Sequence, residues 1–221
     1  SGSGSISNYL APANTTGSLI SGSVRVVPTL NSCVGIADTF EIRIRPQPNA
    51  DAGLEDTLCA GQSVQIGQAA QSNESYSWTS IPSGFSDTAS NVIVTPNSST
   101  RYILSVYDSI TGCLQRDTVG ILVNPILSSN NISADQIICA VQTPNPFSGS
   151  SPSGGNTNYS YQWQSSTDSS TWSDISGANS PNYSSGSLQV NTHFRRVVVS
   201  GPCSDTSAVL RVIVLPALDN N

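Results

Sequence analysis

The five cysteines are the residues of this chain whose chemistry depends most on spacing: Cys33, Cys59, Cys113, Cys139 and Cys203. No two of them form the C-x-x-C pair that zinc sites and thiol redox motifs use. The step from Cys33 to Cys59 is 26 residues and so is the step from Cys113 to Cys139, while the first and third cysteines, like the second and fourth, are 80 residues apart. A period of 80 residues has the size of a small domain, so the spacing predicts repeated modules.

The other candidates for chemistry are a histidine, two carboxylates and a tryptophan. Nucleophilic catalysis needs a base beside the nucleophile, and the only histidine, His193, falls by alternation in a strand that leads to Cys203. Asp168 and Asp174 flank Trp172 and could bind Ca²⁺ or a sugar, but Asp side chains also cap their own backbone in tight loops. We therefore expect turn residues here, and no enzymatic activity, metal or cofactor.

Trp172 lies in a turn-rich segment, where we expect the indole outside the core. It could stack on a sugar ring or on another module, or fold over its own sheet.

Charge and hydropathy exclude several classes of partner. The chain has 8 basic and 14 acidic residues, a formal net charge of −6 and no basic run, whereas proteins that bind nucleic acid concentrate Lys and Arg on one face. Anionic membrane surfaces are disfavoured for the same reason. No apolar run approaches the 18 or more residues that span a bilayer, so no membrane insertion is expected.

The elements that must position these residues are β-hairpins. Cys33, Cys113 and Cys203 are each preceded by a β-rich run and followed within five residues by Asp-Thr, which opens an apolar or alternating stretch that ends at proline. The preceding runs are 24–27, 102–106 and 194–199, and the following ones are 40–46, 119–125 and 208–216. This order of strand, cysteine-containing turn, strand and proline predicts the same β-hairpin at three places in the chain.

Two complete modules follow from this repeat, residues 51–127 and 128–216. Cys59 and Cys139 have similar surroundings near the start of each module, and a short aromatic strand with Trp78 or Trp163 follows about 20 residues later. Each module is predicted to be a seven-strand antiparallel β-sandwich of the immunoglobulin-like type, with its tryptophan in the core. Residues 1–50 would be the C-terminal part of a preceding module, and residues 217–221 the start of a linker.

The module boundaries also predict the disulfides. Each complete module is bracketed by two cysteines, so we expect the pairs Cys59 with Cys113 and Cys139 with Cys203 in an oxidising compartment. Cys33 would be unpaired in this segment, because subtracting the same spacings places its partner upstream of Ser1. The first eight residues contain no initiator Met and no leader pattern, which indicates a processed protein or an excerpt of a longer one.

Three stretches resemble the PKD-like and Ig-like repeats of very large surface adhesins from gliding Bacteroidota. They are YQWQSSTDSSTWSDISGANSPNY with HFRRVVVSGPC, the span from LCAGQSVQIG through YSWTS to TRYILSVYDSITGC, and residues 3–48 with SGSISNYL and VRVVPTLNSCVG. Ser169 stands where the family often has Gly, and His193 with Phe194 where Tyr is common. The resemblance implies tandem PKD-like modules of an extracellular cell-surface protein.

The same resemblance implies secretion through the type IX system and a stalk and contact surface for attachment and gliding. Partners would be neighbouring modules, the type IX and outer-membrane gliding machinery, and surface polysaccharide. Residues 216–221 do not resemble the secretion signal of such proteins, so the segment would be interior. Two alternatives stay open: a carbohydrate-binding appendage of a secreted polysaccharide-degrading enzyme, and a structural filament component.

O-glycosylation is a further expectation. Asp-Thr or Asp-Ser followed by an apolar residue matches the motif of this phylum at Thr57, Thr88, Ser109 and Thr118. The same dipeptide is also an ordinary turn that enters a strand, so both interpretations remain open.

Overall fold

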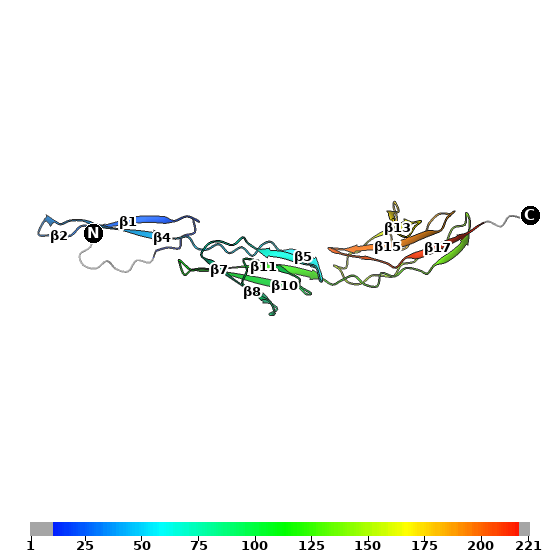
Figure 1. The fold of residues 1–221 in the computed structure, drawn as a ribbon, viewed down its shortest axis with the longest axis horizontal. Coiled ribbons are helices and arrows are strands. Elements are labelled where there is room, and N and C mark those ends of the chain that lie inside the picture. Colours follow the sequence, from blue (N-terminus) through cyan, green and yellow to red (C-terminus); the bar gives the residue numbers. More distant parts are fainter. Residues whose placement is uncertain (1–10, 217–221) are drawn as a thin grey trace, which may run out of the picture. The chain divides into compact units, whose positions relative to one another are not determined.

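The computed structural model describes residues 11–216, and within them all regular secondary structure is β-strand (Figure 1). None of these residues belongs to a helix long and apolar enough to cross a membrane. The chain divides into two compact units. The first comprises the residues up to Leu54 with Gln65–Val92 and Arg101–Val119, and the second comprises Glu55–Val64, Ile93–Thr100 and the residues from Gly120 onward.

The first unit opens with a two-stranded sheet. Strand β1 (Ile20–Val26) pairs antiparallel with β4 (Asp38–Ile44), and the short strands β2 (Thr29–Leu30) and β3 (Cys33–Val34) extend the hairpin. This confirms the first predicted hairpin with shifted bounds, since the two strands were expected at 24–27 and 40–46. Its apolar side chains remain largely in solvent, since Phe40 is 46% exposed.

The predicted middle module, 51–127, contains seven strands. Five form a sheet in the order β5-β11-β10-β7-β8, and two form a separate pair, β6-β9 (Figure 1). Strand β5 runs parallel to the end of β11, while β10 and β7 are antiparallel. The strand bounds are β5 (Asp56–Cys59), β6 (Val64–Gly67), β7 (Glu74–Ile81), β8 (Ser86–Asp87), β9 (Asn91–Val94), β10 (Thr100–Asp108) and β11 (Leu114–Asn124).

The strand interiors follow the two-residue period of a half-buried sheet. In β10 the side chains of Tyr102, Leu104 and Val106 are buried while their neighbours are not. Trp78 of β7 is fully buried, as predicted, and its indole N–H donates to the carbonyl of Ala89 at 2.9 Å. A buried tryptophan needs such a partner for its one polar atom.

Gly67 explains how the backbone can approach this tryptophan closely. Its φ is +96°, and a Cβ there would overlap the carbonyl oxygen of Ser90 and come within 2.9 Å of the Trp78 ring. Only glycine fits this position.

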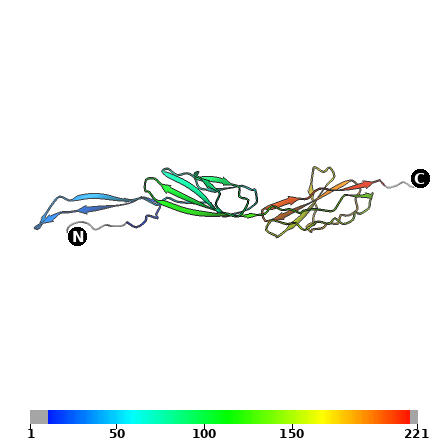
Figure 2. The same ribbon diagram turned by 90° about the horizontal axis from the view of Figure 1, so that it is seen from below.

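The predicted third module, 128–216, repeats the strand order. Its sheet runs β12-β17-β15-β13-β14, again with a parallel pairing of the first strand to the last. Strand β16 pairs with β15 and precedes β17, so the final strand of the module is interrupted. Figure 2 shows the ribbon of this module, coloured from green to red, turned by 90° from the view of Figure 1. The bounds are β12 (Gln136–Cys139), β13 (Ser160–Ser166), β14 (Ser173–Asp174), β15 (Thr192–Ser200), β16 (Cys203–Thr206) and β17 (Leu210–Leu215).

The layer opposite this sheet differs from the expected seven-strand pattern. It is built from irregular segments joined by isolated bridges, such as Phe147 with Tyr183. These segments still close a core, in which Trp163 and Phe147 are fully buried. The rest of that cluster consists of Ala178, Phe194, Leu210 and Val212.

The fold class predicted from the sequence is confirmed: the chain is all-β, with immunoglobulin-like sandwich modules. The evidence is the shared strand order, in which an edge strand runs parallel to the last strand, and a buried tryptophan at the same place in both sheets.

Candidate functional site

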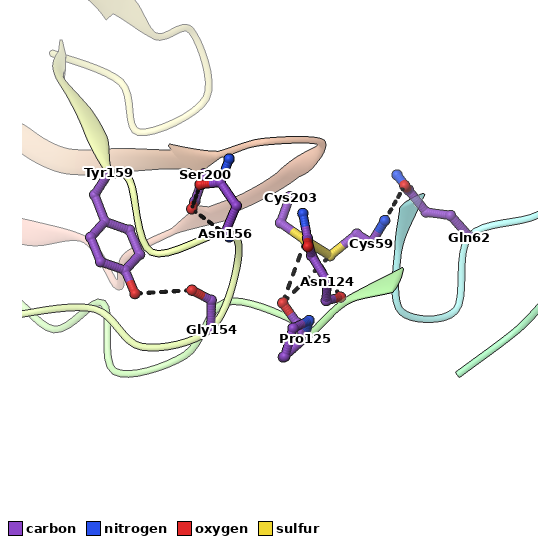
Figure 3. Close-up of a disulfide and its surroundings, with 9 residues drawn as sticks. All are labelled: Cys59, Gln62, Asn124, Pro125, Gly154, Asn156, Tyr159, Ser200 and Cys203. Carbon is purple, nitrogen blue, oxygen red and sulfur yellow. Dashed lines mark hydrogen bonds between the residues drawn. A yellow bond between two sulfur atoms is a disulfide. The ribbon is translucent and has the colours of Figure 1, made fainter. Parts of the chain in front are cut away.

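The structure joins Cys59 to Cys203, with 5.1 Å between their Cα atoms (Figure 3). This corrects the expected pairs, Cys59 with Cys113 and Cys139 with Cys203. Both bonded cysteines belong to the second compact unit. Cys33, Cys113 and Cys139 are free thiols, which agrees with the expectation for Cys33 alone.

The expected pairs fail because of the length of the last strand of each module. Cys113 directly precedes the eleven-residue strand β11, whereas Cys59 lies opposite Asn124 at its far end. At about 3.3 Å per residue, the strand separates them by more than 30 Å, and a disulfide needs Cα atoms within about 7 Å. Cys139 lies in the same way opposite Leu215, far from Cys203.

The backbone around each sulfur is fixed by hydrogen bonds. The Cys59 N–H donates to Oε1 of Gln62 at 2.9 Å (Figure 3). The Ala60 N–H donates to the carbonyl of Asn124 at 2.9 Å. Cys203 begins β16, opposite Ser200 across the hairpin turn. Its side chain is 1% exposed and packs with Leu127 and Val198.

The segment that follows β11 is part of this site. Sγ of Cys203 lies 3.5 Å from the carbonyl oxygen of Pro125. This is a contact and not a hydrogen bond, because a disulfide sulfur carries no proton. The Gly155 N–H donates to the same carbonyl at 2.8 Å. Added Cβ atoms at Gly154 and Gly155 would overlap Ile126 and Ser200, so both glycines allow a close approach of the backbone.

Trp172 and Asp174 do not form a ligand pair, but they belong to one surface network. The Arg195 guanidinium lies 4.2 Å from the centre of the Trp172 ring, and its Nε–H donates to Gln164 at 2.6 Å. Gln164 in turn donates to Asp174 at 2.7 Å. The indole is therefore folded over its own sheet, and Arg195 covers one of its faces.

Asp168 stabilises its own loop. Its Oδ1 accepts from the N–H of Thr171 at 2.7 Å, from the N–H of Ser170 at 2.8 Å and from the hydroxyl of Ser166 at 2.8 Å. These hydrogen bonds, led by that of Thr171, hold the pKa of the Asp168 carboxyl well below its usual range. Asp168 is the turn residue that the sequence predicted.

His193 lies in β15, as predicted. Ser166 is its neighbour across the sheet, but the Ser166 hydroxyl donates to Asp168. The His193 Nδ1 atom has no hydrogen-bond partner among residues 11–216. In the same residues no three side chains of the types that bind metal ions gather in one place.

Sequence reasoning missed the role of Arg196, which is fully buried. Its guanidinium donates to the carbonyls of Pro181 at 2.7 Å and Ser150 at 2.9 Å and to Oδ1 of Asn130 at 2.9 Å. Burial lowers the pKa of Arg196. The sequence did contain a signal for this burial. Side chains alternate along a strand, so Arg196, two residues after the apolar Phe194, points to the same buried face of β15.

All four candidate O-glycosylation residues are exposed: Thr57, Thr88, Ser109 and Thr118. The backbone N–H groups of Thr57 and Thr88 donate to the carboxylates of the preceding aspartates at 2.7 Å and 2.6 Å. This is the local turn geometry that the dipeptide favours. The Ser109 hydroxyl donates to the carbonyl of Asn73 at 3.0 Å. Glycosylation of these residues stays a prediction.

Residues 128–216 match a family described as a domain of unknown function, DUF8696. The chain matches no curated protein. Among solved structures it is similar to domains A168-A170 from titin, with 13% identity over 86% of this chain and 74% of the chain of those domains, at a TM-score of 0.46. Extracellular domains 3–5 of Drosophila OTK match with 12% identity over 88% of this chain and 71% of theirs, at a TM-score of 0.47. The fibronectin(III)-like modules of Clostridium thermocellum CbhA match with 11% identity over 78% of this chain and 97% of theirs, at a TM-score of 0.41.

Proposed function

We propose that this chain is a non-catalytic repeat segment of a secreted cell-surface adhesin, in which the modules form a stalk and a contact surface for attachment and gliding. The observation that carries the proposal is the Cys59–Cys203 disulfide, which joins residues of the two predicted modules, 51–127 and 128–216. A covalent link between repeats suits a protein that must transmit force.

The disulfide also supports an extracellular location, because disulfides persist in oxidising compartments. Secretion through the type IX system, and contact with the gliding machinery and with surface polysaccharide, are the finer parts of the proposal. They rest on the sequence resemblance.

The carbohydrate-binding appendage is a weaker candidate. Such a module needs aromatic faces open for stacking, and Trp172 is half-buried with Arg195 against its ring. Trp78 and Trp163 are fully buried.

The test is an antibody raised against residues 128–216, applied to intact cells that make the parent protein. We expect labelling without permeabilisation, and we expect deletion of residues 51–216 to weaken attachment to glass while the remaining protein still reaches the surface. Labelling that appears only after lysis, or attachment unchanged by the deletion, contradicts the proposal. The purified chain should release no product from polysaccharides or peptides.

A further inference from the structure

Cys139 is a second copy of the Cys59 site. The Cys139 N–H donates to Oε1 of Gln142 at 3.0 Å, as the Cys59 N–H does to Gln62 at 2.9 Å. In both places an alanine follows the cysteine, and its N–H donates to the carbonyl of the residue opposite that cysteine. Ala140 donates to Leu215 at 2.8 Å, and Ala60 donates to Asn124 at 2.9 Å. The two thiols are therefore presented by the same backbone geometry at the end of the same strand.

Cys33 and Cys113 are copies of the Cys203 site. Cys33 and Cys203 each begin the strand that follows a hairpin turn, and they face the last residue of the strand before it, Leu30 and Ser200. Cys113 lies one residue before β11. The Asp108 N–H donates to the carbonyl of Cys113 at 3.0 Å in the corresponding place. The chain thus contains two kinds of cysteine, one at the end of an edge strand and one after a hairpin turn.

The existing disulfide fixes the rule by which these two kinds pair. Cys59 is the edge-strand cysteine of the predicted module 51–127, and Cys203, to which it is bonded, is the hairpin cysteine of the predicted module 128–216. Inside a single module the two kinds lie at opposite ends of the last strand and cannot meet. Pairing from each module to the next is therefore the arrangement that the geometry allows.

The surroundings of the free hairpin cysteine Cys33 agree with a missing partner. Cys203 is 1% exposed, whereas Cys33 is exposed at the tip of β2 and β3. Around it Leu30 and Val34 are 76% and 71% exposed, and they line an open apolar hollow with Pro28. An apolar tip of this kind is what a neighbouring module would cover.

We infer that the three free cysteines belong to a disulfide ladder, in which the edge-strand cysteine of every module bonds the hairpin cysteine of the next. Cys139 bonds the hairpin cysteine of a following module of the same type, and Cys113 and Cys33 bond edge-strand cysteines of preceding ones. The separation of 144 residues in Cys59–Cys203 places the partner of Cys139 beyond Asn221 and those of Cys113 and Cys33 before Ser1. The ladder does not depend on what the protein attaches to.

Each bond forms by thiol–disulfide exchange with an oxidised disulfide oxidoreductase or a small-molecule disulfide. The thiolate of one cysteine attacks the oxidant and forms a mixed disulfide, and the second thiolate displaces it. One S–S bond forms in the protein and one breaks in the oxidant, which takes up two electrons and two protons and leaves as two thiols.

The test adds a second copy of residues 128–216 to the full 221-residue chain, after Leu218. Leu218 stands two residues after Pro216, as Leu127 stands two residues after Pro125. The product is refolded with oxidised and reduced glutathione and mapped by mass spectrometry of non-reduced peptides. We expect two bonds: Cys59 with Cys203 of the first copy, and Cys139 of the first copy with Cys203 of the added copy.

The control replaces the first Cys139 with Ser, after which the hairpin cysteine of the added copy should become alkylatable while Cys59–Cys203 persists. A Cys139 that stays free, or that bonds Cys203 of its own copy, overturns the inference. Absence of the Cys59–Cys203 bond overturns it as well, because that bond is the template for the ladder.

Discussion

At the scale of single residues, the adjacent arginines of β15 have opposite environments. Arg196 donates to Pro181, Ser150 and Asn130 from a fully buried position, whereas Arg195 lies over Trp172 at the surface. A lysine keeps the charge but cannot span three acceptors. We expect Arg196→Lys to lower the free energy of unfolding by about 3 kcal/mol and Arg195→Lys by less than about 1 kcal/mol.

Urea denaturation of the two variants measures this difference. Equal midpoints for Arg196→Lys and Arg195→Lys contradict a structural role for the buried guanidinium.

Asp168 gives a residue-scale prediction about pH. Its folded pKa is depressed by the loop hydrogen bonds, so the stabilisation they provide is present above the unfolded pKa of about 3.9. It is lost as the pH falls through the folded pKa. An NMR titration of the Asp168 carboxyl carbon should have its midpoint well below 3.9, and Ser166→Ala should raise it by removing one donor. A midpoint near 4 contradicts the loop geometry.

At the scale of elements, the strands place two tryptophans in cores and one outside. Trp163 of β13 is fully buried and donates to the Ser180 carbonyl at 3.0 Å, while Trp172 lies just before β14. Trp163→Ala should lower the free energy of unfolding by about 3–5 kcal/mol, and Trp172→Ala should lower it by about 1 kcal/mol or less. Thermal unfolding followed by circular dichroism compares them, and similar losses from both substitutions contradict the assigned positions.

The elements were largely predictable because their signals are local. Alternation in the runs before the hairpin cysteines and the aromatic strands with Trp78 and Trp163 indicated the strands and cores correctly. The disulfide was predicted wrongly because spacing in the sequence counts residues along the chain, whereas pairing depends on which end of a strand each cysteine occupies. The opposite layer of residues 128–216 was also missed, since isolated bridges such as Phe147 with Tyr183 leave no alternating pattern.

At the scale of the whole molecule, the disulfide should decide how stable the chain is. In the chain-entropy model, a disulfide that closes a loop of 144 residues stabilises the folded state by about 5 kcal/mol. Replacing Cys59 and Cys203 together with Ser should lower the free energy of unfolding by about 3–5 kcal/mol. Cys113→Ser, which removes a free thiol, is the matched control and should change little. A double variant as stable as the control contradicts the pairing.

The central claim, that a covalent bond between the two predicted modules carries load, is tested most directly by stretching the chain between its two ends in optical tweezers, before and after reduction. A Cys59–Cys203 bond withholds 144 residues, so reduction should lengthen the fully unfolded chain by about 500 Å. Pairing within each module would withhold loops of 54 and 64 residues, or about 410 Å. A gain of about 500 Å, absent from the double Cys59 and Cys203 serine variant, is the predicted result, and a gain of about 410 Å or none contradicts it.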